Sequence, residues 1–153
     1  MPRPPPAPAM LLAHTRAVSP PLGSCELTHL ERTPIDVSRA VGEHAAYELA
    51  LRRIGVTVRR LAPAPHLPDA VFVEDTAVVF DELAIITRPG AESRRPERRA
   101  VAASLAAHRS LEIIEEPATL DGGDVLVDGR RVYVGRSSRT NDAAIVQLAR
   151  ILH

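Results

Sequence analysis

The chain has 153 residues, of which 45% are hydrophobic and 25% charged, a composition that fits one globular domain. Its 19 basic residues, all Arg, balance 19 acidic residues, so it lacks the basic excess of a nucleic-acid-binding protein. The single cysteine, Cys25, excludes an internal disulfide and a multi-Cys metal site and favours a cytoplasmic location, and no apolar run is long enough to span a membrane.

The chain alternates strand and helix patterns behind a Pro-rich leader, residues 1–10, which we expect to be disordered. Asp36 is a good helix N-cap, and Gly55 stands where a helix commonly ends. The expected elements, in chain order, are a strand over Leu11–Val18, a helix over Val37–Ile54, a strand over Val56–Leu61, a hairpin of Thr76–Phe80 with Leu83–Thr87, a helix over Glu97–His108, a strand over Leu111–Ile114, a hairpin of Asp124–Val127 with Arg131–Gly135, and a helix over Asn141–Leu152.

The two hairpins indicate an internal repeat. Asp75 opens the first hairpin and Asp124 the second, 49 residues later, and an Arg follows the second strand of each. Such spacing predicts a repeated module of two strands, a helix and a strand, several of which must pack together to bury a core.

Carboxylates gather at the junction before the first hairpin, in the segment PDAVFVED, residues 68–75. Asp69, Glu74 and Asp75 surround Phe72 there. Carboxylates are costly to desolvate unless they meet a cation, and a guanidinium suits them because two carboxylates accept its forked N–H donors. A solvated acidic loop is the alternative interpretation.

The segment TLDGGDV, residues 119–125, places Asp121 and Asp124 on either side of two glycines, which allow close approach of the backbone to a ligand. Arg88 and Arg139 each follow the second strand of a hairpin, so we expect both at one mouth, where they would bind a substrate carboxylate. Surface ion pairing is the alternative for the two arginines.

The segments PDAVFVED, ITRPGAESRR, TLDGGDV and SSRTN, in this order and spacing, resemble the dimethylarginine dimethylaminohydrolase family and, more widely, the guanidine-modifying enzymes that include arginine deiminase. The resemblance runs from about Leu11 to the end. It implies an α/β fold of the pentein type, an α/β-propeller of five ββαβ modules. Residues 11–153 would then be the N-terminal part of one catalytic domain, about the first half to two-thirds of those modules.

The resemblance also implies roles for individual residues. Asp75 would hold the substrate guanidinium, with Glu74 helping to order the site and Phe72 walling the alkyl chain. Asp69 and Arg88 would bind the amino-acid end of the substrate, and Arg139 would bind its carboxylate. The backbone of Leu30 would contact the substrate. Asp121 would orient a catalytic histidine.

The family's nucleophile is a late Cys assisted by a His, and neither has a clear counterpart among these residues. Cys25 precedes every matching motif and is expected to be structural. His153 falls at the end of the last helix, too early to be the general acid and base. The histidines lack a metal-ligand spacing such as HExxH, so we expect no metal and no cofactor.

Three hypotheses remain open at this point: a fragment of a methylarginine- or arginine-hydrolysing enzyme that is inactive alone, a non-catalytic guanidine binder, and one part of a split enzyme. Each takes a small guanidine compound as ligand, with no nucleic acid or membrane partner. An open propeller leaves strand edges uncovered, so we expect a second polypeptide or self-association to cover them.

Overall fold

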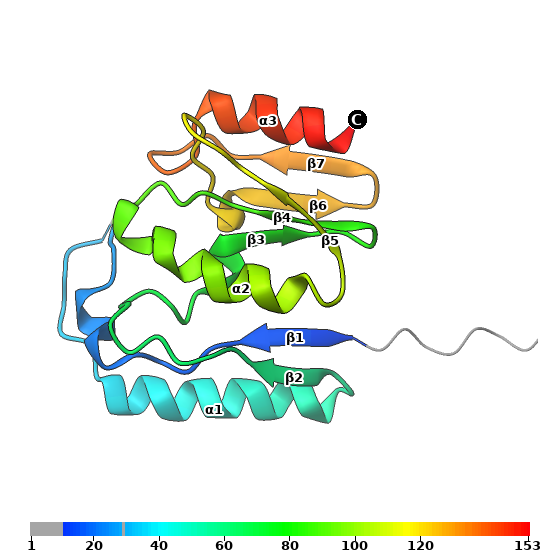
Figure 1. Cartoon of the computed structure of the whole chain (residues 1–153). Coiled ribbons are helices and arrows are strands. Elements are labelled where there is room, and N and C mark those ends of the chain that lie inside the picture. Colours follow the sequence, from blue (N-terminus) through cyan, green and yellow to red (C-terminus); the bar gives the residue numbers. More distant parts are fainter. Residues whose placement is uncertain (1–10, 29) are drawn as a thin grey trace, which may run out of the picture.

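The computed structural model describes residues 11–28 and 30–153, and its elements follow the predicted order. The leader predicted for residues 1–10 lies outside the described residues. Three small sheets lie side by side, each accompanied by one helix (Figure 1). None of the helices in the described ranges is long and apolar enough to cross a membrane.

The first sheet pairs β1 (Leu12–Thr15) in parallel with β2 (Thr57–Arg60), and α1 (Val37–Arg53) connects the two strands. As predicted, the side chain of Asp36 caps α1 by accepting a hydrogen bond from the Arg39 amide. Gly55 follows the helix with φ of +86°, a conformation that favours glycine.

The first strand is shorter than the predicted Leu11–Val18 because Arg16 leaves the sheet and turns into the interior. Its guanidinium is buried and donates to the backbone carbonyls of Ala70 and Glu97. Strand pairing therefore stops at Thr15, and the chain continues into the loop that leads toward the acidic segment.

The apolar side chains at helical spacing in α1, such as Val41 and Leu49, do not form its buried face. Val41 and Leu49 are both exposed, and the fully buried side chain of the helix is Glu48. Glu48 accepts hydrogen bonds from Thr15 of β1 and from Arg60 of β2, so an ionic contact, rather than an apolar stripe, joins α1 to its sheet.

The second sheet contains a complete module of two strands, a helix and a strand. β3 (Ala77–Val79) pairs antiparallel with β4 (Leu83–Ile86), α2 (Arg98–Leu105) follows, and β5 (Ser110–Ile113) returns parallel to β4. The predicted hairpin and repeat unit are confirmed here. The predicted helix over Glu97–His108 is shorter, because the segment that contains Pro96 adopts 3-10 geometry.

The third sheet is the antiparallel hairpin of β6 (Val125–Asp128) and β7 (Arg131–Val134), followed by α3 (Asp142–Leu152). Gly129 in the predicted Asp-Gly turn has φ of +57°, and Asn141 caps α3 by accepting from the Ala144 amide. The described part of the chain also contains four short 3-10 helices: η1 (Pro20–Ser24), η2 (Val73–Thr76), η3 (Glu92–Glu97) and η4 (Gly122–Asp124).

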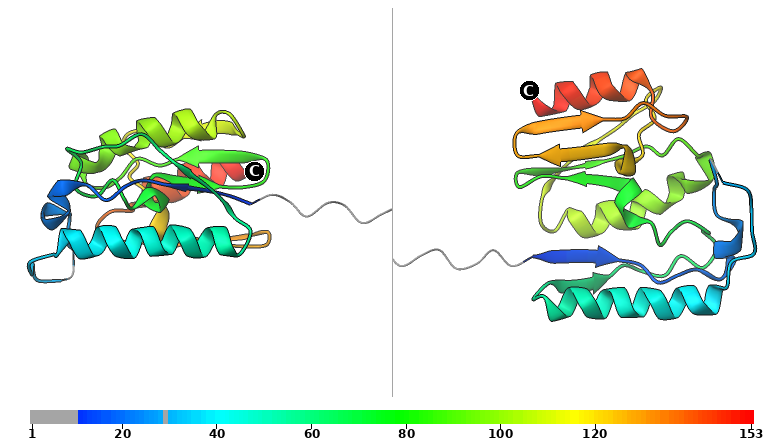
Figure 2. Two further views of the ribbon diagram at one scale, coloured as in Figure 1. Left: turned by 90° about the horizontal axis from the view of Figure 1, so that it is seen from below. Right: turned by 180° about the vertical axis from the view of Figure 1, so that it is seen from behind.

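Two apolar clusters hold the sheets together. One lies between the second sheet and α3 and includes Ile85, Ile114 and Leu148, and the other lies under α2 around Ile86 and Val101. The views from below and behind show α1 and α2 on different sides of the molecule, with the loops that precede β3 and β6 gathered between the sheets (Figure 2). Those loops carry the acidic motifs.

Candidate functional site

A pocket of about 380 Å³ collects residues from three of the sequence motifs. It contains four of the predicted site residues: Leu30, Asp75, Asp121 and Arg139. Together with the flanking Glu26 and Asp124, the lining carries four carboxylates and one guanidinium, an excess of negative charge that suits a cationic ligand.

Asp75 enters this pocket from η2, with its side chain 17% exposed. One carboxylate oxygen accepts a hydrogen bond from the Gly123 amide at 3.1 Å, and the other accepts from Arg94 at 2.6 Å. One oxygen is thus held by Gly123 in the pocket lining and the other by the buried Arg94. The carboxylate is fixed in position, and its open side faces the pocket.

The two glycines of the DGGD motif bring its backbone against the acidic segment. A Cβ added at Gly122 would stand 2.1 Å from the Glu74 carbonyl oxygen, and one at Gly123 would stand 2.7 Å from the Asp75 carboxylate. Neither glycine has a positive φ, so close approach rather than backbone conformation requires them. This contact places Asp121 and Asp124 beside Asp75.

Asp121 is almost fully buried at the pocket floor, where it forms hydrogen bonds with residues of two other motifs, ITRPGAESRR and SSRTN. It accepts a hydrogen bond from the Gly90 amide at 3.0 Å and from Arg139 at 3.3 Å. Burial raises the pKa of the Asp121 carboxyl, although the hydrogen bond from Gly90 opposes the shift. Arg139 also donates to the Thr28 hydroxyl at 2.7 Å, so its guanidinium bridges two walls of the pocket.

Asp69 lies just behind the same wall, with the residue 3% exposed. Both of its carboxylate oxygens accept from the backbone amide of Glu26, at 3.0 and 3.1 Å. Burial raises the pKa of the Asp69 carboxyl. Asp69 therefore fixes the loop that carries Glu26 and Thr28, the rim of the pocket.

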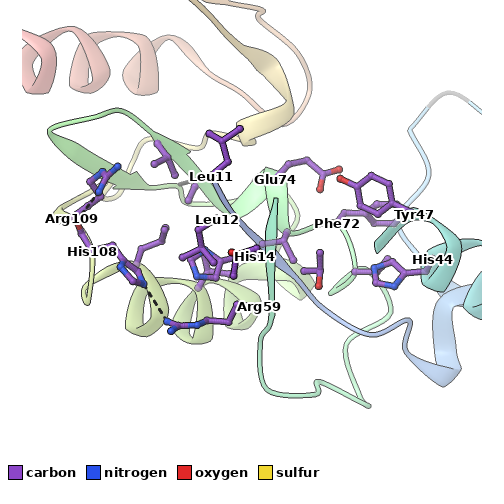
Figure 3. A pocket seen from close by; sticks show the side chains of 18 residues that line it. Leu11, Leu12, His14, His44, Tyr47, Arg59, Phe72, Glu74, His108 and Arg109 are labelled. Atoms are coloured by element: carbon purple, nitrogen blue, oxygen red, sulfur yellow. Dashed lines mark hydrogen bonds between the residues drawn. The ribbon is translucent and has the colours of Figure 1, made fainter. Parts of the chain in front are cut away.

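Phe72 and Glu74 point into a different hollow, a groove of about 990 Å³ between β1 and the second sheet (Figure 3). Its floor is mostly apolar, and burial raises the pKa of the Glu74 carboxyl there. His14, Arg59 and His108 lie toward the other end of the groove. The acidic segment thus separates two pockets, with Asp75 on one side and Glu74 on the other.

The structure does not bring Arg88 to either pocket. Its guanidinium donates to the Ala118 carbonyl at 3.2 Å and to the exposed carboxylate of Glu116 at 3.0 Å. Arg88 and Arg139 therefore do not meet at one mouth, because Ala118 and Glu116 hold the Arg88 guanidinium, whereas Asp121 and Thr28 hold that of Arg139.

The arginine that contacts the acidic segment is Arg94, which the sequence reasoning missed. It lies in η3 with 1% of its side chain exposed. Burial disfavours its charge, but hydrogen bonds to Glu97 and Asp75 outweigh burial and raise the pKa of Arg94. The spacing of Arg94 and Glu97, three residues apart around Pro96, was the available signal for a buried ion pair.

The remaining residues that were weighed for chemistry lie outside the pocket lining. Cys25 is 5% exposed and directly precedes Glu26 of the rim loop, in agreement with a structural role. His153 follows the last turn of α3, as predicted. Among residues 11–28 and 30–153, no cluster of three or more His, Cys, Asp or Glu side chains is arranged to hold a metal ion.

Comparison with known proteins gives consistent relatives. A sequence model of the family described as N,N dimethylarginine dimethylhydrolase, eukaryotic, matches residues 29–152. A dimethylarginine dimethylaminohydrolase of Streptomyces coelicolor is 47% identical over 137 residues, covering 89% of this chain and 53% of that protein. The enzyme of the same name from Pseudomonas aeruginosa is 40% identical, covering 76% and 47%. The chain thus spans about half the length of these relatives.

Solved structures agree with the sequence comparison. A mutant of the Pseudomonas aeruginosa enzyme in complex with citrulline has a TM-score of 0.88 at 35% identity, covering 94% of this chain and 56% of that one. The N-terminal domain of ArgZ, an arginine dihydrolase of cyanobacteria, has a TM-score of 0.83 at 18% identity, covering 94% and 55%, a likeness of fold alone. The predicted α/β fold of the pentein type is confirmed.

Proposed function

The chain belongs to the dimethylarginine dimethylaminohydrolase family, and on this premise we propose that it forms the substrate-binding part of a hydrolase that converts N-omega-methylated arginine to citrulline and a methylamine. The observation that carries the proposal is the small pocket, where four carboxylates and Arg139 converge from separate motifs. A methylated arginine offers the complementary groups, a guanidinium and a carboxylate.

Asp75 holds the guanidinium in this proposal. Its carboxylate is fixed by the Gly123 amide and Arg94, so no side-chain freedom is lost when a ligand binds. Arg139 takes the substrate carboxylate by exchanging one of its present contacts, to Asp121 or Thr28, for a new one.

Other residues support the site in this proposal. Asp69 and the backbone near Leu30 form the boundary of the pocket at the amino-acid end of the substrate. Asp69 acts there through the rim loop, which it anchors at Glu26. Asp121, buried and bonded to Gly90, orients the catalytic histidine. Phe72 and Glu74 line the neighbouring groove and act from behind the segment that carries Asp75. Arg88 has no ligand contact in this arrangement.

We propose that the nucleophilic Cys and the general-acid His come from polypeptide other than these 153 residues. The thiolate adds to the guanidinium carbon, the C–N bond to the methylated nitrogen breaks, and the amine leaves with a proton from the His. Water then adds to the thiouronium carbon, which frees citrulline and restores the thiolate. Cys25 does not fit this role because it is buried and does not line the pocket.

We propose also that residues 11–153 make up part of an α/β-propeller of five modules. The complete module β3–β4–α2–β5 and the shorter units on either side support this arrangement, as does the length of the chain, about half that of the Streptomyces coelicolor relative. Neighbouring modules, or a second chain, would pack at the edge of β1 that no other described strand pairs with and at the exposed Leu126 of β6.

The test is an assay of citrulline formation from dimethylarginine, first by the purified chain and then by the chain mixed with the complementary half of the Streptomyces coelicolor relative. We expect no turnover by the chain alone and turnover after mixing. Turnover by the chain alone would contradict the assignment of the nucleophile to other polypeptide.

A non-catalytic guanidine-binding protein is the second candidate, favoured by a pocket with a preset carboxylate and an accessible arginine but no exposed thiol. Calorimetry with arginine and with methylarginine separates the two candidates. Binding without turnover after mixing would favour the second, and absence of heat at millimolar ligand would contradict both for the isolated chain.

A further inference from the structure

Arg94 sits between two carboxylates that face opposite ways. Its Nη1 donates to Asp75 at 2.6 Å, on the side of the pocket. Its Nε and Nη2 donate to Glu97, at distances of 2.9 to 3.3 Å, on the side of the interior. Glu97 has 1% of its side chain exposed and lines neither the small pocket nor the groove, so a ligand in either of them does not contact it.

The guanidinium of Arg94 is held by further groups that carry no charge. Its Nη2 also donates to the backbone carbonyls of Phe72 and Asp69. The arginine therefore cannot swing toward a ligand without breaking several buried hydrogen bonds, each of which is costly to leave unmade. Its positive charge stays next to Asp75 whether or not a ligand is present.

The charge balance around Asp75 depends on Glu97. The charged side chains in direct contact with Arg94 are the carboxylates of Asp75 and Glu97. Together with Arg94 they carry a net charge of −1. Without the carboxylate of Glu97 the same set would be neutral, and the full positive charge of Arg94 would offset Asp75.

We propose that Glu97 is a positioning residue of the binding site, whose charge neutralises Arg94 and leaves the charge of Asp75 to attract a guanidinium. This inference rests on the proposed function, because it presumes that Asp75 meets a guanidinium ligand. Glu97 acts through Arg94 and touches no ligand. Arg94 in turn fixes the orientation of Asp75. Glu97 and Arg94 together therefore set both the orientation of the Asp75 carboxylate and the charge balance around it.

A purely structural role for Glu97 makes a different prediction. If Glu97 only connects η3 to the acidic segment, its loss would weaken the binding of every ligand to the same extent. If Glu97 sets the charge of the site, its loss would weaken the binding of a cationic ligand but not that of a neutral ligand of the same shape. Citrulline is such a ligand, since a neutral ureido group replaces the guanidinium of arginine.

Calorimetry of arginine and citrulline binding to the chain and to its Glu97→Gln variant tests the proposal. We expect the preference for arginine over citrulline to fall on the order of tenfold in the variant, as loss of one nearby charge predicts. Glu92→Gln is the matched control, because Glu92 also pairs with an arginine three residues away but has 82% of its side chain exposed. An unchanged preference in Glu97→Gln would overturn the proposal.

Thermal melts without ligand test the same charge balance independently. In Asp75→Asn, Glu97 still neutralises Arg94, and in Glu97→Gln, Asp75 does so. The double variant leaves Arg94 buried without a carboxylate partner, so we expect its loss of melting temperature to exceed the sum of the two single losses. Additive losses would overturn the charge assignment. If the unmodified chain shows no preference for arginine, the proposed function fails, whereas the melts still decide the role of Glu97.

Discussion

Gly122 is the point where the DGGD loop touches the acidic segment, and replacing it with alanine is a direct test of the site's construction. The added Cβ would stand 2.1 Å from the Glu74 carbonyl oxygen and 3.2 Å from that of Ala77. Both obstacles are backbone atoms, so neither can rotate away as a side chain would. The two loops must separate for the methyl group to fit.

The expected cost follows from the nature of the contact. Overpacking of this kind costs about 1–3 kcal/mol, and the upper part of that range applies because the clash is with backbone. Each kcal/mol lowers the melting temperature of a domain of this size by about 2–4 °C. The Gly122→Ala variant should therefore melt about 4–12 °C below the unmodified chain and bind arginine more weakly, because Asp75 loses its place beside Gly123.

Gly42→Ala is the matched control for this experiment. Gly42 is exposed within α1, and a Cβ added there meets nothing within 4 Å. Alanine in a helix interior is about 1 kcal/mol more favourable than glycine, so this variant should be more stable than the unmodified chain. Urea unfolding followed by circular dichroism measures both. A Gly122→Ala variant as stable as the unmodified chain would refute the close packing of the two loops.

Two further predictions concern charged contacts. The hydrogen bond from Arg60 lowers the pKa of Glu48 from 4.5 to about 2, so this contact stabilises the fold above pH 4.5 and is lost as the pH falls toward 2. Because Arg60 is half exposed, we expect Glu48→Gln to cost only about 1–2 kcal/mol at pH 6 in urea unfolding and clearly less at pH 2, and an equal cost at both pH values would contradict this. Arg139→Gln should weaken the affinity for arginine about tenfold or more in calorimetry, but should leave the affinity for agmatine, which lacks the carboxylate, unchanged. An equal loss of affinity for both ligands would argue against a carboxylate contact.

Much of the fold follows from local patterns in the sequence. Asp36, Gly55 and Asn141 mark the helix ends because capping needs only a side chain and the adjacent amides. The repeat of an acidic residue before each hairpin predicted the module that β3, β4, α2 and β5 form. Such features depend on residues close together in the chain.

Other features depend on contacts between distant segments, which local patterns do not encode. The buried face of α1 is set by Glu48 meeting Thr15 and Arg60, so an apolar stripe was a poor guide to it. Arg88 and Arg94 lie in one motif, and only packing of η3 against the acidic segment decides that Arg94 reaches Asp75. The sequence predicted which motifs meet at the pocket, but not which arginine contacts Asp75.

The central claim is that the small pocket around Asp75, rather than the larger groove beside it, binds a guanidinium ligand. NMR titration of the isotope-labelled chain with arginine tests this most directly. The account predicts that arginine shifts the backbone amide signals of Gly123, Asp121 and Arg139, and that these shifts disappear in the Asp75→Asn variant. Shifts confined to groove residues such as His14 and His108, or no shifts at millimolar arginine, would contradict it.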